Sequence, residues 1–125
     1  RVAMAPDAGA SVTLGRLVGH RKAMEILLTS PTIGAEEAQA LGIVNKVVPD
    51  AALLDEAMAL ARDLAARAPR ALAATKRLLW NGIASAVEAC LPEEARTVTE
   101  LSGTADAREG LAAVLQKRTP KFTGR

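Results

Sequence analysis

The sequence predicts a mostly α-helical chain, and three observations support this fold class. Alanine, the strongest helix former, supplies 27 of the 125 residues. Apolar residues recur at spacings of three and four along several stretches, as they do on the buried face of a helix. Only residues 43–48 combine β-branched side chains with the pattern of a strand. Helices should therefore dominate the structure.

Two helices are expected near the start of the chain. The first should begin after Pro6, where the Asp7 side chain can accept a hydrogen bond from the first turn. It should end at Gly19, because glycine readily adopts the left-handed conformation that terminates helices. The second should cover residues 20–29 and stop at Ser30-Pro31.

A short helix and a single strand are expected next. Residues 35–42 carry two acids in a first helical turn and glycine at the end, which is typical of a short helix. Residues 43–48 are predicted to be a strand that stops at Pro49. One strand cannot form a sheet, so it either pairs with a segment outside this chain or packs as an isolated extended segment.

The rest of the chain is expected to be helical. Asp50 should cap a long helix that runs to about residue 68, and Pro69 suits the first turn of the next helix. The sequence Pro92-Glu93-Glu94 predicts the start of a further helix.

The last helix has a candidate capping box in Asp106-Ala107-Arg108-Glu109, with aspartate in place of serine or threonine. Leu111, Val114 and Leu115 are expected to face inward from this helix, and Pro120 is expected to end it.

The core of such a chain should be thin. Trp80 and Phe122 are its only aromatic residues, and alanine contributes little apolar area when it is buried. A chain of 125 residues suffices for one domain. We therefore expect these helices to pack against another surface, which belongs either to a partner or to a longer chain that contains them. The absence of an initial methionine also favours a fragment or a processed chain.

Composition excludes several classes of protein. With Cys90 as the only cysteine, an internal disulfide framework is impossible, and a reducing, cytoplasmic location is expected. With His20 as the only histidine, a His/Cys zinc site has at most two candidate ligands, so no metal is expected. No apolar run is long enough for a membrane span, and the first residues lack a signal-peptide core.

Charge is nearly balanced overall, with 16 basic and 14 acidic residues, but its placement is uneven. The last nine residues contain four basic residues and no acid, Lys117 and Lys121 among them. Such a segment either attracts phosphate groups or is a solvated tail that aids solubility. Binding to nucleic acid is not expected, because no predicted helix displays a basic, polar face.

A search for catalytic motifs finds few candidates. The chain has no glycine-rich phosphate loop, nucleophile elbow or two-histidine motif. Glu36 and Glu37 diverge on their helix and suit the helix dipole better than an acid–base pair. Cys90 is expected to be a small, buried or half-buried residue. The residues alone therefore predict a helical chain that self-associates or forms part of a larger protein.

A series of segments in order along the chain resembles the crotonase superfamily, the enoyl-CoA hydratase/isomerase group. The resemblance covers essentially the whole chain and resides in Ala5-Pro6-Asp7-Ala8-Gly9, residues 14–19, 23–29, 33–38 and 41–44, Ala71-Leu72-Ala73-Ala74-Thr75-Lys76, Asp106-Ala107-Arg108-Glu109-Gly110 and residues 117–125. The Pro-Asp-Ala-Gly sequence and the end of the chain are most similar to the branch of ring-epoxide phenylacetyl-CoA isomerases.

The resemblance implies a fold for the whole enzyme, of which this chain would be the C-terminal half. Residues 1–49 would be the end of an α/β spiral of βαβ turns. Residues 50–125 would form the helical region that covers the coenzyme A site and assembles the protein into trimers or hexamers. The predicted strand would then find its sheet partners in the preceding half of the fold.

The resemblance also implies a chemistry. The family stabilises a thioester enolate in an oxyanion hole, whose two backbone donors would precede Arg1. Asp7 matches a catalytic aspartate of dienoyl-CoA isomerases, although a purely capping role is the alternative. Lys117 matches a lysine that helps to hold coenzyme A phosphates, and Lys121 lies in the same basic segment. An acyl-CoA thioester would be the substrate, with no tightly bound cofactor.

Two departures from the family pattern lie near the expected coenzyme A site. Val98 and Val114 stand where some hydratases have aromatic residues, which points away from a standard short-chain hydratase. The alternative to an acyl-CoA enzyme is a non-catalytic helical module that self-associates.

Overall fold

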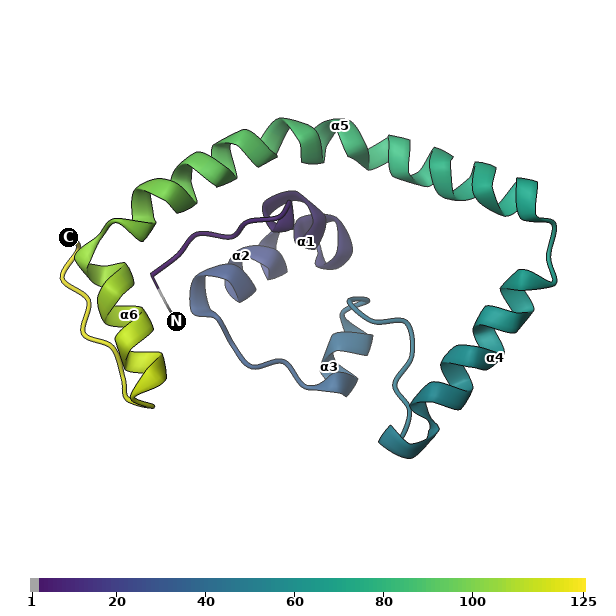
Figure 1. Cartoon of the computed structure of the whole chain (residues 1–125), viewed down its shortest axis with the longest axis horizontal. Helices are drawn as coiled ribbons and strands as arrows, with labels where there is room; N and C mark the ends of the chain where they lie inside the picture. The colour runs from purple at the N-terminus through teal and green to yellow at the C-terminus, as the bar shows by residue number, and fades with distance from the viewer. Residues whose placement is uncertain (1–2) are drawn as a thin grey trace. The chain divides into compact units, whose positions relative to one another are not determined.

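The structure is a computed structural model that describes residues 3–125, and these residues form helices joined by turns and loops (Figure 1). The elements are α1 (Ala10–Val18), α2 (His20–Thr29), α3 (Ala35–Ala40), the short 3₁₀ helix η1 (Asp50–Ala52), α4 (Leu53–Ala65), α5 (Pro69–Ser102) and α6 (Ala105–Leu115). Residues 3–125 contain no β-strand. The predicted mostly α-helical class is therefore confirmed.

The strand expected at residues 43–48 does not form. The backbone N–H groups of Ile43 and Val44 both donate to the carbonyl of Ala38, at 2.9 and 3.3 Å. These bonds close the C-terminal end of α3 in a turn, so the same N–H groups cannot take part in a strand ladder. Ile43 and Val44 therefore belong to the end of α3 rather than to a strand.

The described residues form two compact units, one made of residues 3–32 and 86–125 and the other of residues 33–85. In the first unit, α1 and α2 pack against each other on either side of Gly19 (Figure 1). The backbone φ of Gly19 is 80°, which only glycine adopts at low cost. The predicted break at Gly19 and the predicted extent of the second helix are both confirmed.

The start of α1 differs from the prediction. The helix begins at Ala10, its N-cap is Gly9, and no side chain caps it from that position. Asp7 instead contributes its backbone carbonyl, which accepts a hydrogen bond from the Ala10 N–H at 2.9 Å. The prediction that the Asp7 side chain caps the helix was therefore wrong.

Helix α5 is continuous across Pro92, so the predicted helix start at Pro92-Glu93-Glu94 was wrong. Proline removes one backbone donor from the helix. Arg96 bridges Glu93 at 2.5 Å and Glu100 at 2.7 Å, and such pairs on one face support a helix by about 0.2–0.5 kcal/mol each. Tertiary contacts made by Glu94, described below, hold the same turn.

Two further capping predictions need correction. Asp50 lies within η1, and no side chain caps η1 or α4. At α6 the cap is Thr104, whose hydroxyl oxygen accepts a hydrogen bond from the Ala107 N–H at 3.0 Å. Asp106 does not cap the helix, because its carboxylate is bound to the end of the chain.

The buried face of α6 is made of small residues, Ala107, Gly110 and Ala113. Leu111, Val114 and Leu115 are 58%, 52% and 77% exposed, so the prediction that they face inward was wrong. The helix also ends at Leu115, well before Pro120. The chain reverses just beyond it, where Lys117 has a φ of 52°.

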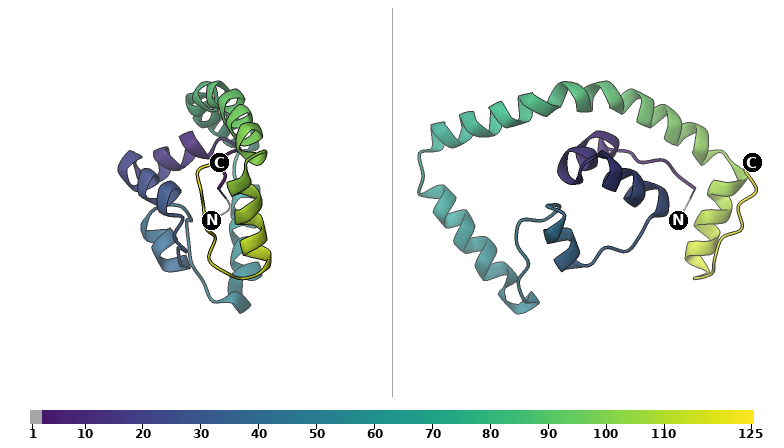
Figure 2. Two further views of the ribbon diagram at one scale, coloured as in Figure 1. Left: turned by 90° about the vertical axis from the view of Figure 1, so that its left-hand side faces the viewer. Right: turned by 180° about the vertical axis from the view of Figure 1, so that it is seen from behind.

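The end of the chain runs back beside α6, and the two views in Figure 2 agree on this arrangement. The backbone N–H of Arg118 donates to the carbonyl of Ala113 at 3.0 Å. The N–H of Asp106 donates to the carbonyl of Arg125 at 2.9 Å.

The core is as thin as the composition predicts. Among the described residues, the buried apolar side chains are Ala23, Val87, Ala107 and Ala113. No residue of the unit formed by residues 33–85 is fully buried, and Trp80 is 56% exposed. Extended exposed apolar surface of this kind marks an interaction surface.

Although α5 has 34 residues, neither it nor another helix within residues 3–125 is apolar enough over a sufficient length to cross a membrane.

Candidate functional site

Asp7 lies at the first position of a tight turn that leads into α1. The turn is closed by the hydrogen bond from the Ala10 N–H to the Asp7 carbonyl, and its central residues, Ala8 and Gly9, have φ values of 54° and 80°. Positive φ at both central positions is the feature of a type I′ turn. A left-handed alanine costs roughly 1–2 kcal/mol, so the surrounding structure must hold this conformation.

The group that holds the turn is the Glu94 carboxylate of α5. One oxygen accepts a hydrogen bond from the Gly9 N–H at 2.7 Å. The other accepts from the Ser11 N–H at 3.1 Å and from the Ser11 hydroxyl. Glu94 therefore satisfies backbone donors at the start of α1 that have no partner within the helix.

Glu94 is held in its ionised form by these contacts. It is buried, with 7% of its surface exposed, and burial by itself would raise its pKa. The hydrogen bond from the Ser11 side chain is the largest influence and lowers the pKa below its ordinary value, with the Gly9 and Ser11 N–H groups and the Cys90 thiol adding to it. A buried carboxylate with this many donors is a structural anchor rather than a proton donor.

The turn is also packed tightly against α5 at a second point. A Cβ atom placed on Gly9 would lie 3.0 Å from Cγ1 of Val87, one of the buried apolar residues. Gly9 is therefore required both by its left-handed conformation and by the close approach of Val87. Cys90 lies on the same stretch of α5, half-buried as predicted, and its thiol donates to the Val87 carbonyl at 3.1 Å.

The Asp7 side chain is exposed on the solvent side of this fixed turn. Within residues 3–125 no hydrogen bond or ion pair engages its carboxylate. An unengaged carboxylate on a rigid backbone can exchange a proton with a bound molecule. Asp7 thus retains the chemical capacity that a general acid or base requires.

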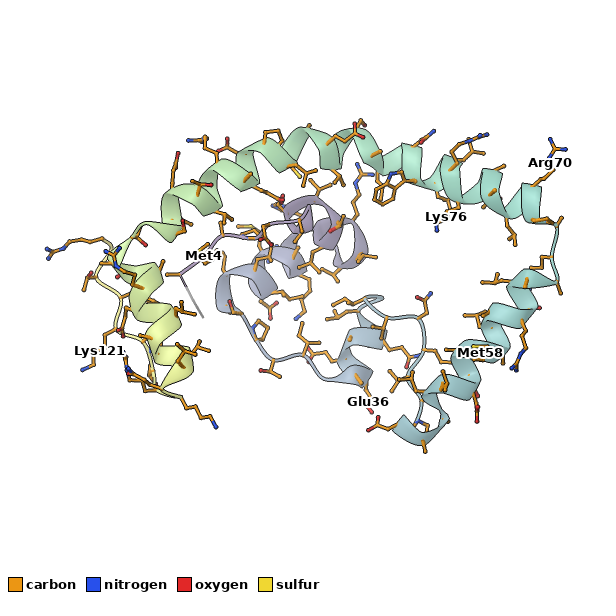
Figure 3. The ribbon with its side chains drawn as sticks, in the orientation of Figure 1. Met4, Glu36, Met58, Arg70, Lys76 and Lys121 are labelled. Atoms are coloured by element: carbon orange, nitrogen blue, oxygen red, sulfur yellow. The ribbon has the colours of Figure 1, made fainter. Side chains whose placement is uncertain are left out.

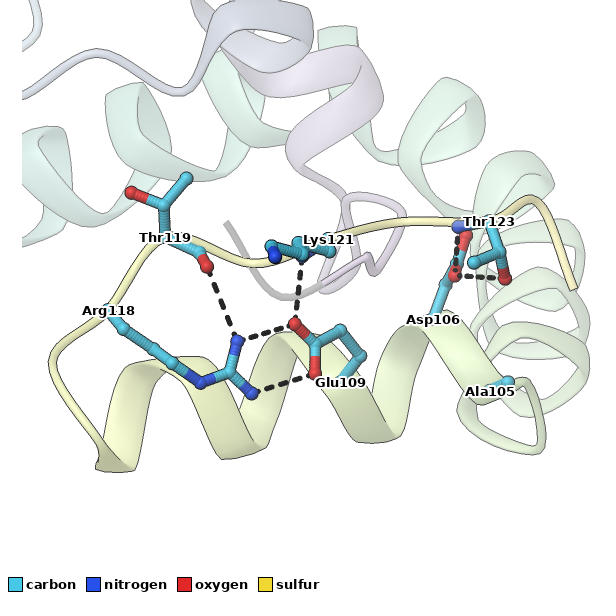
Figure 4. Close-up of a pocket in the computed structure, with 7 residues that line it drawn as sticks. All are labelled: Ala105, Asp106, Glu109, Arg118, Thr119, Lys121 and Thr123. Carbon is cyan, nitrogen blue, oxygen red and sulfur yellow. Dashed lines mark hydrogen bonds and ion pairs between the residues drawn. The ribbon is translucent and has the colours of Figure 1, made fainter.

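The second cluster of charged residues joins α6 to the basic end of the chain (Figure 4). The Arg118 guanidinium donates to both oxygens of the Glu109 carboxylate, at 2.6 and 2.8 Å. The Lys121 backbone N–H donates to the same carboxylate at 2.8 Å. The hydrogen bond from Arg118, the largest influence, and that from Lys121 lower the pKa of Glu109 to about 2.

Asp106 anchors the last residues one turn away. Its carboxylate accepts hydrogen bonds from the backbone N–H groups of Thr123 and Gly124, each at 2.7 Å, and from the Thr123 hydroxyl at 3.2 Å. These bonds, of which the one from the Thr123 N–H has the largest effect, lower the pKa of Asp106. The basic segment is therefore fastened to α6 and is not a loose tail.

The two lysines predicted to bind coenzyme A differ in their placement. Lys121 lines an open pocket of about 490 Å³ between α6 and the end of the chain, together with Glu109 and Arg118 (Figures 3 and 4). Lys117 does not line this pocket and lies exposed at the chain reversal. No hydrogen bond or ion pair in the described part of the chain joins Asp7 to either lysine.

The unit formed by residues 33–85 holds an apolar groove between α4 and α5. Its volume is about 510 Å³, and its lining includes Leu64 of α4 and Leu72, Lys76 and Trp80 of α5; Figure 3 labels Lys76. Lys76 is the one charged side chain among the residues that line this groove. Within residues 3–125, no three side chains of the metal-binding types gather closely enough to hold an ion.

No local pattern in the sequence identifies the residues that organise these sites. Glu94 lies in the segment that predicts a helix start at Pro92-Glu93-Glu94, yet it bonds to Gly9, 85 positions away. Asp106 and Glu109 match the pattern of a capping box, yet both bind the returning end of the chain. Only the charge excess of the last nine residues hints at acidic partners elsewhere.

The chain is similar throughout its length to proteins of one family. Residues 1–125 match the family model described as enoyl-CoA hydratase/isomerase. The chain is 42% identical over 125 residues to a probable enoyl-CoA hydratase of Rhodobacter capsulatus, and 40% identical over 120 residues to the 2,3-dehydroadipyl-CoA hydratase of Escherichia coli. These alignments cover 100% and 96% of this chain, and 49% and 47% of those proteins.

Solved structures give the same result for the fold. A crystal structure of an enoyl-CoA hydratase from Mycobacterium avium subsp. paratuberculosis superposes with a TM-score of 0.93 at 30% identity, covering 98% of this chain and 50% of that one. The enoyl-CoA hydratase/isomerase from Pseudoalteromonas atlantica gives a TM-score of 0.89 at 30% identity, covering 98% and 49%. The chain belongs to the enoyl-CoA hydratase/isomerase family, within the crotonase superfamily, and spans about half the length of these relatives.

Proposed function

We propose that the chain is the C-terminal part of an acyl-CoA enzyme of the hydratase or isomerase type. The observation that carries the proposal is the match of all 125 residues to the family, at about half the length of relatives named as hydratases. The alternative of a non-catalytic self-association module is not favoured by these relatives. The division into the end of a spiral at residues 1–49 and a helical region at residues 50–125 belongs to the same proposal.

In the proposed reaction, the enzyme polarises the thioester carbonyl of an acyl-CoA substrate and stabilises the enolate that forms when the acyl chain loses a proton, in isomerisation, or when water adds to its double bond, in hydration. Two backbone N–H groups that precede this chain supply the oxyanion hole. Asp7 transfers a proton at a carbon of the acyl chain near the thioester. Its exposure and its unengaged carboxylate support this role. No tightly bound cofactor takes part.

Lys117 and Lys121 are proposed to bind the phosphates of coenzyme A. Both are exposed, and Lys121 lies on a segment that Glu109 and Asp106 fix to α6. Arg118 is already committed to Glu109, which leaves the two lysines and Arg125 as the basic side chains of the last nine residues for an incoming phosphate.

The whole enzyme is proposed to be a cytoplasmic homo-oligomer, a trimer or hexamer. The exposed apolar side chains along α4 and α5, such as Leu54 and Leu79 at 73% and 71%, need a covering surface. The preceding half of the fold and neighbouring subunits together would supply it.

The test is an assay of the full natural polypeptide that contains these residues, with a panel of enoyl-CoA thioesters. Hydration adds the mass of one water to the product, whereas isomerisation leaves the mass unchanged and moves the double bond. A ring-epoxide phenylacetyl-CoA substrate belongs in the panel, because the resemblance to that branch remains a prediction. Absence of turnover with every thioester would overturn the proposal.

A further inference from the structure

The strained turn that presents Asp7 is fixed from a distance. Ala8 is left-handed, and a single backbone hydrogen bond, from Ala10 to Asp7, closes the turn locally. The net stability that one such bond contributes is comparable to the cost of a left-handed alanine. The turn therefore depends on contacts from outside its own residues.

Those contacts come from one carboxylate. Glu94 binds the N–H groups on both sides of Ala10, at Gly9 and Ser11, so it fixes the position and the direction of the peptide planes at the start of α1. Both oxygens are used, and the Ser11 hydroxyl fixes the rotation of the carboxylate itself. Val87, two turns earlier on α5, closes the other side of Gly9.

We propose that Glu94 is a positioning residue, which holds the Asp7–Ala10 turn so that the Asp7 carboxylate meets the acyl chain in a reactive geometry. The proposal rests on the proposed role of Asp7 in proton transfer. Glu94 itself does not touch the substrate, because its oxygens are buried and occupied by the start of α1. A displacement of about 1 Å at a reacting group can cost a hundredfold in rate, so even a small relaxation of the turn would be measurable.

The amide that replaces the carboxylate in E94Q has nearly the same shape but only one acceptor oxygen. Its NH₂ group would face the N–H of either Gly9 or Ser11, so one of the two backbone bonds must be lost. The matched control is E93Q, which removes one charge from the adjacent, exposed residue of the same helix.

The experiment is a double-mutant cycle in the full natural polypeptide, with steady-state turnover of an enoyl-CoA thioester measured for wild type, E94Q, D7N, E94Q/D7N and E93Q. If Glu94 acts through Asp7, E94Q lowers kcat at least tenfold with little change in KM, and it has no further effect once Asp7 is replaced. E93Q leaves kcat within twofold of wild type.

The contrary outcomes separate the two proposals. An E94Q defect of the same size in the D7N background would mean a general structural role and would overturn the positioning proposal alone. A D7N variant with wild-type kcat would overturn the proposed role of Asp7, and with it the positioning proposal. Backbone hydrogen exchange gives a readout independent of turnover: the Gly9 and Ser11 amides should lose protection in E94Q, and unchanged protection would also overturn the proposal.

Discussion

The Glu94 carboxylate and the Gly9 backbone N–H are joined by a 2.7 Å hydrogen bond between residues 85 positions apart in the sequence. This bond, with the two that Ser11 donates, connects the middle of α5 to the turn that carries Asp7. The exposed carboxylate at position 7 and the buried one at position 94 thus have different tasks. We propose that the first meets the substrate, whereas the second orders the backbone at the start of α1.

Removal of the Glu94 carboxylate should weaken the fold. In E94A the N–H groups of Gly9 and Ser11 lose their acceptor, and a buried donor without a partner costs about 1–3 kcal/mol. Urea denaturation followed by circular dichroism should show a loss of this size in the free energy of unfolding. The exposed neighbour provides the control, since E93A should change stability by no more than about 0.5 kcal/mol. Equal losses in both variants would mean that the Glu94 contacts are not formed.

Stability should depend on pH through Glu109. Its pKa in the folded protein is about 2, below the ordinary value of 4.5, because Arg118 and the Lys121 N–H bind its charged form. Between these values the unfolded chain binds more protons than the folded one, so the free energy of unfolding falls as pH falls from about 4.5 to about 2. Glu94 and Asp106, whose pKa values are also lowered, act in the same direction.

The contribution of Glu109 to this pH dependence can be isolated. In E109Q the slope of the unfolding free energy against pH should be shallower across that window, measured by denaturation at several pH values. A slope identical to that of the wild type would show that the pairing with Arg118 is absent in solution.

Substitution of Gly9 by alanine should be destabilising for two separable reasons. The residue has a φ of 80°, which costs an alanine roughly 1–2 kcal/mol, and its new Cβ would lie 3.0 Å from Cγ1 of Val87. In the G9A/V87A double variant the close contact is removed, while the backbone cost remains. G9A should therefore cost less stability in the V87A background than in the wild type, as measured by thermal unfolding. Equal costs in the two backgrounds would contradict the contact.

Neutralisation of Lys117 and Lys121 should weaken the binding of coenzyme A thioesters. Loss of one charge-assisted contact to phosphate should raise KM by about tenfold, which corresponds to about 1.4 kcal/mol. K117A and K121A should show this effect with a coenzyme A substrate, but not with a pantetheine thioester that lacks the nucleotide phosphates. K22A, which removes a lysine paired with Glu25 on α2, is the control for net charge. A similar rise in KM for the pantetheine substrate would contradict phosphate binding.

Local sequence signals predicted much of the helical framework. The break at Gly19, the stop at Ser30-Pro31 and the start at Pro69 all depend on the backbone preferences of glycine and proline, and the structure confirms each of them. The predictions at Asp7, Pro92 and Asp106 were wrong. At each of these positions, the residue itself or a neighbour forms hydrogen bonds with a segment that is distant in the sequence.

The candidate site was only partly accessible from the sequence. Asp7 and the two lysines come from a family resemblance, which depends on short motifs that can be recognised locally. No role could be predicted for Glu94 or Glu109. The partner of Glu94 is a backbone N–H group 85 positions away. The partners of Glu109 lie 9 and 12 positions away, on the segment that returns beside α6. The prediction of a strand at residues 43–48 was wrong for a similar reason, because the end of α3 uses backbone N–H groups that a strand would need.

The proposed transfer of a proton by Asp7 can be tested directly by following proton exchange on the acyl chain. Nuclear magnetic resonance can follow the incorporation of deuterium from heavy water into the acyl chain of a coenzyme A thioester bound to the full natural polypeptide. The wild type should catalyse this exchange, and D7N should slow it by about 10² to 10⁴-fold, the usual contribution of a general acid or base. An exchange rate in D7N equal to that of the wild type would contradict the account.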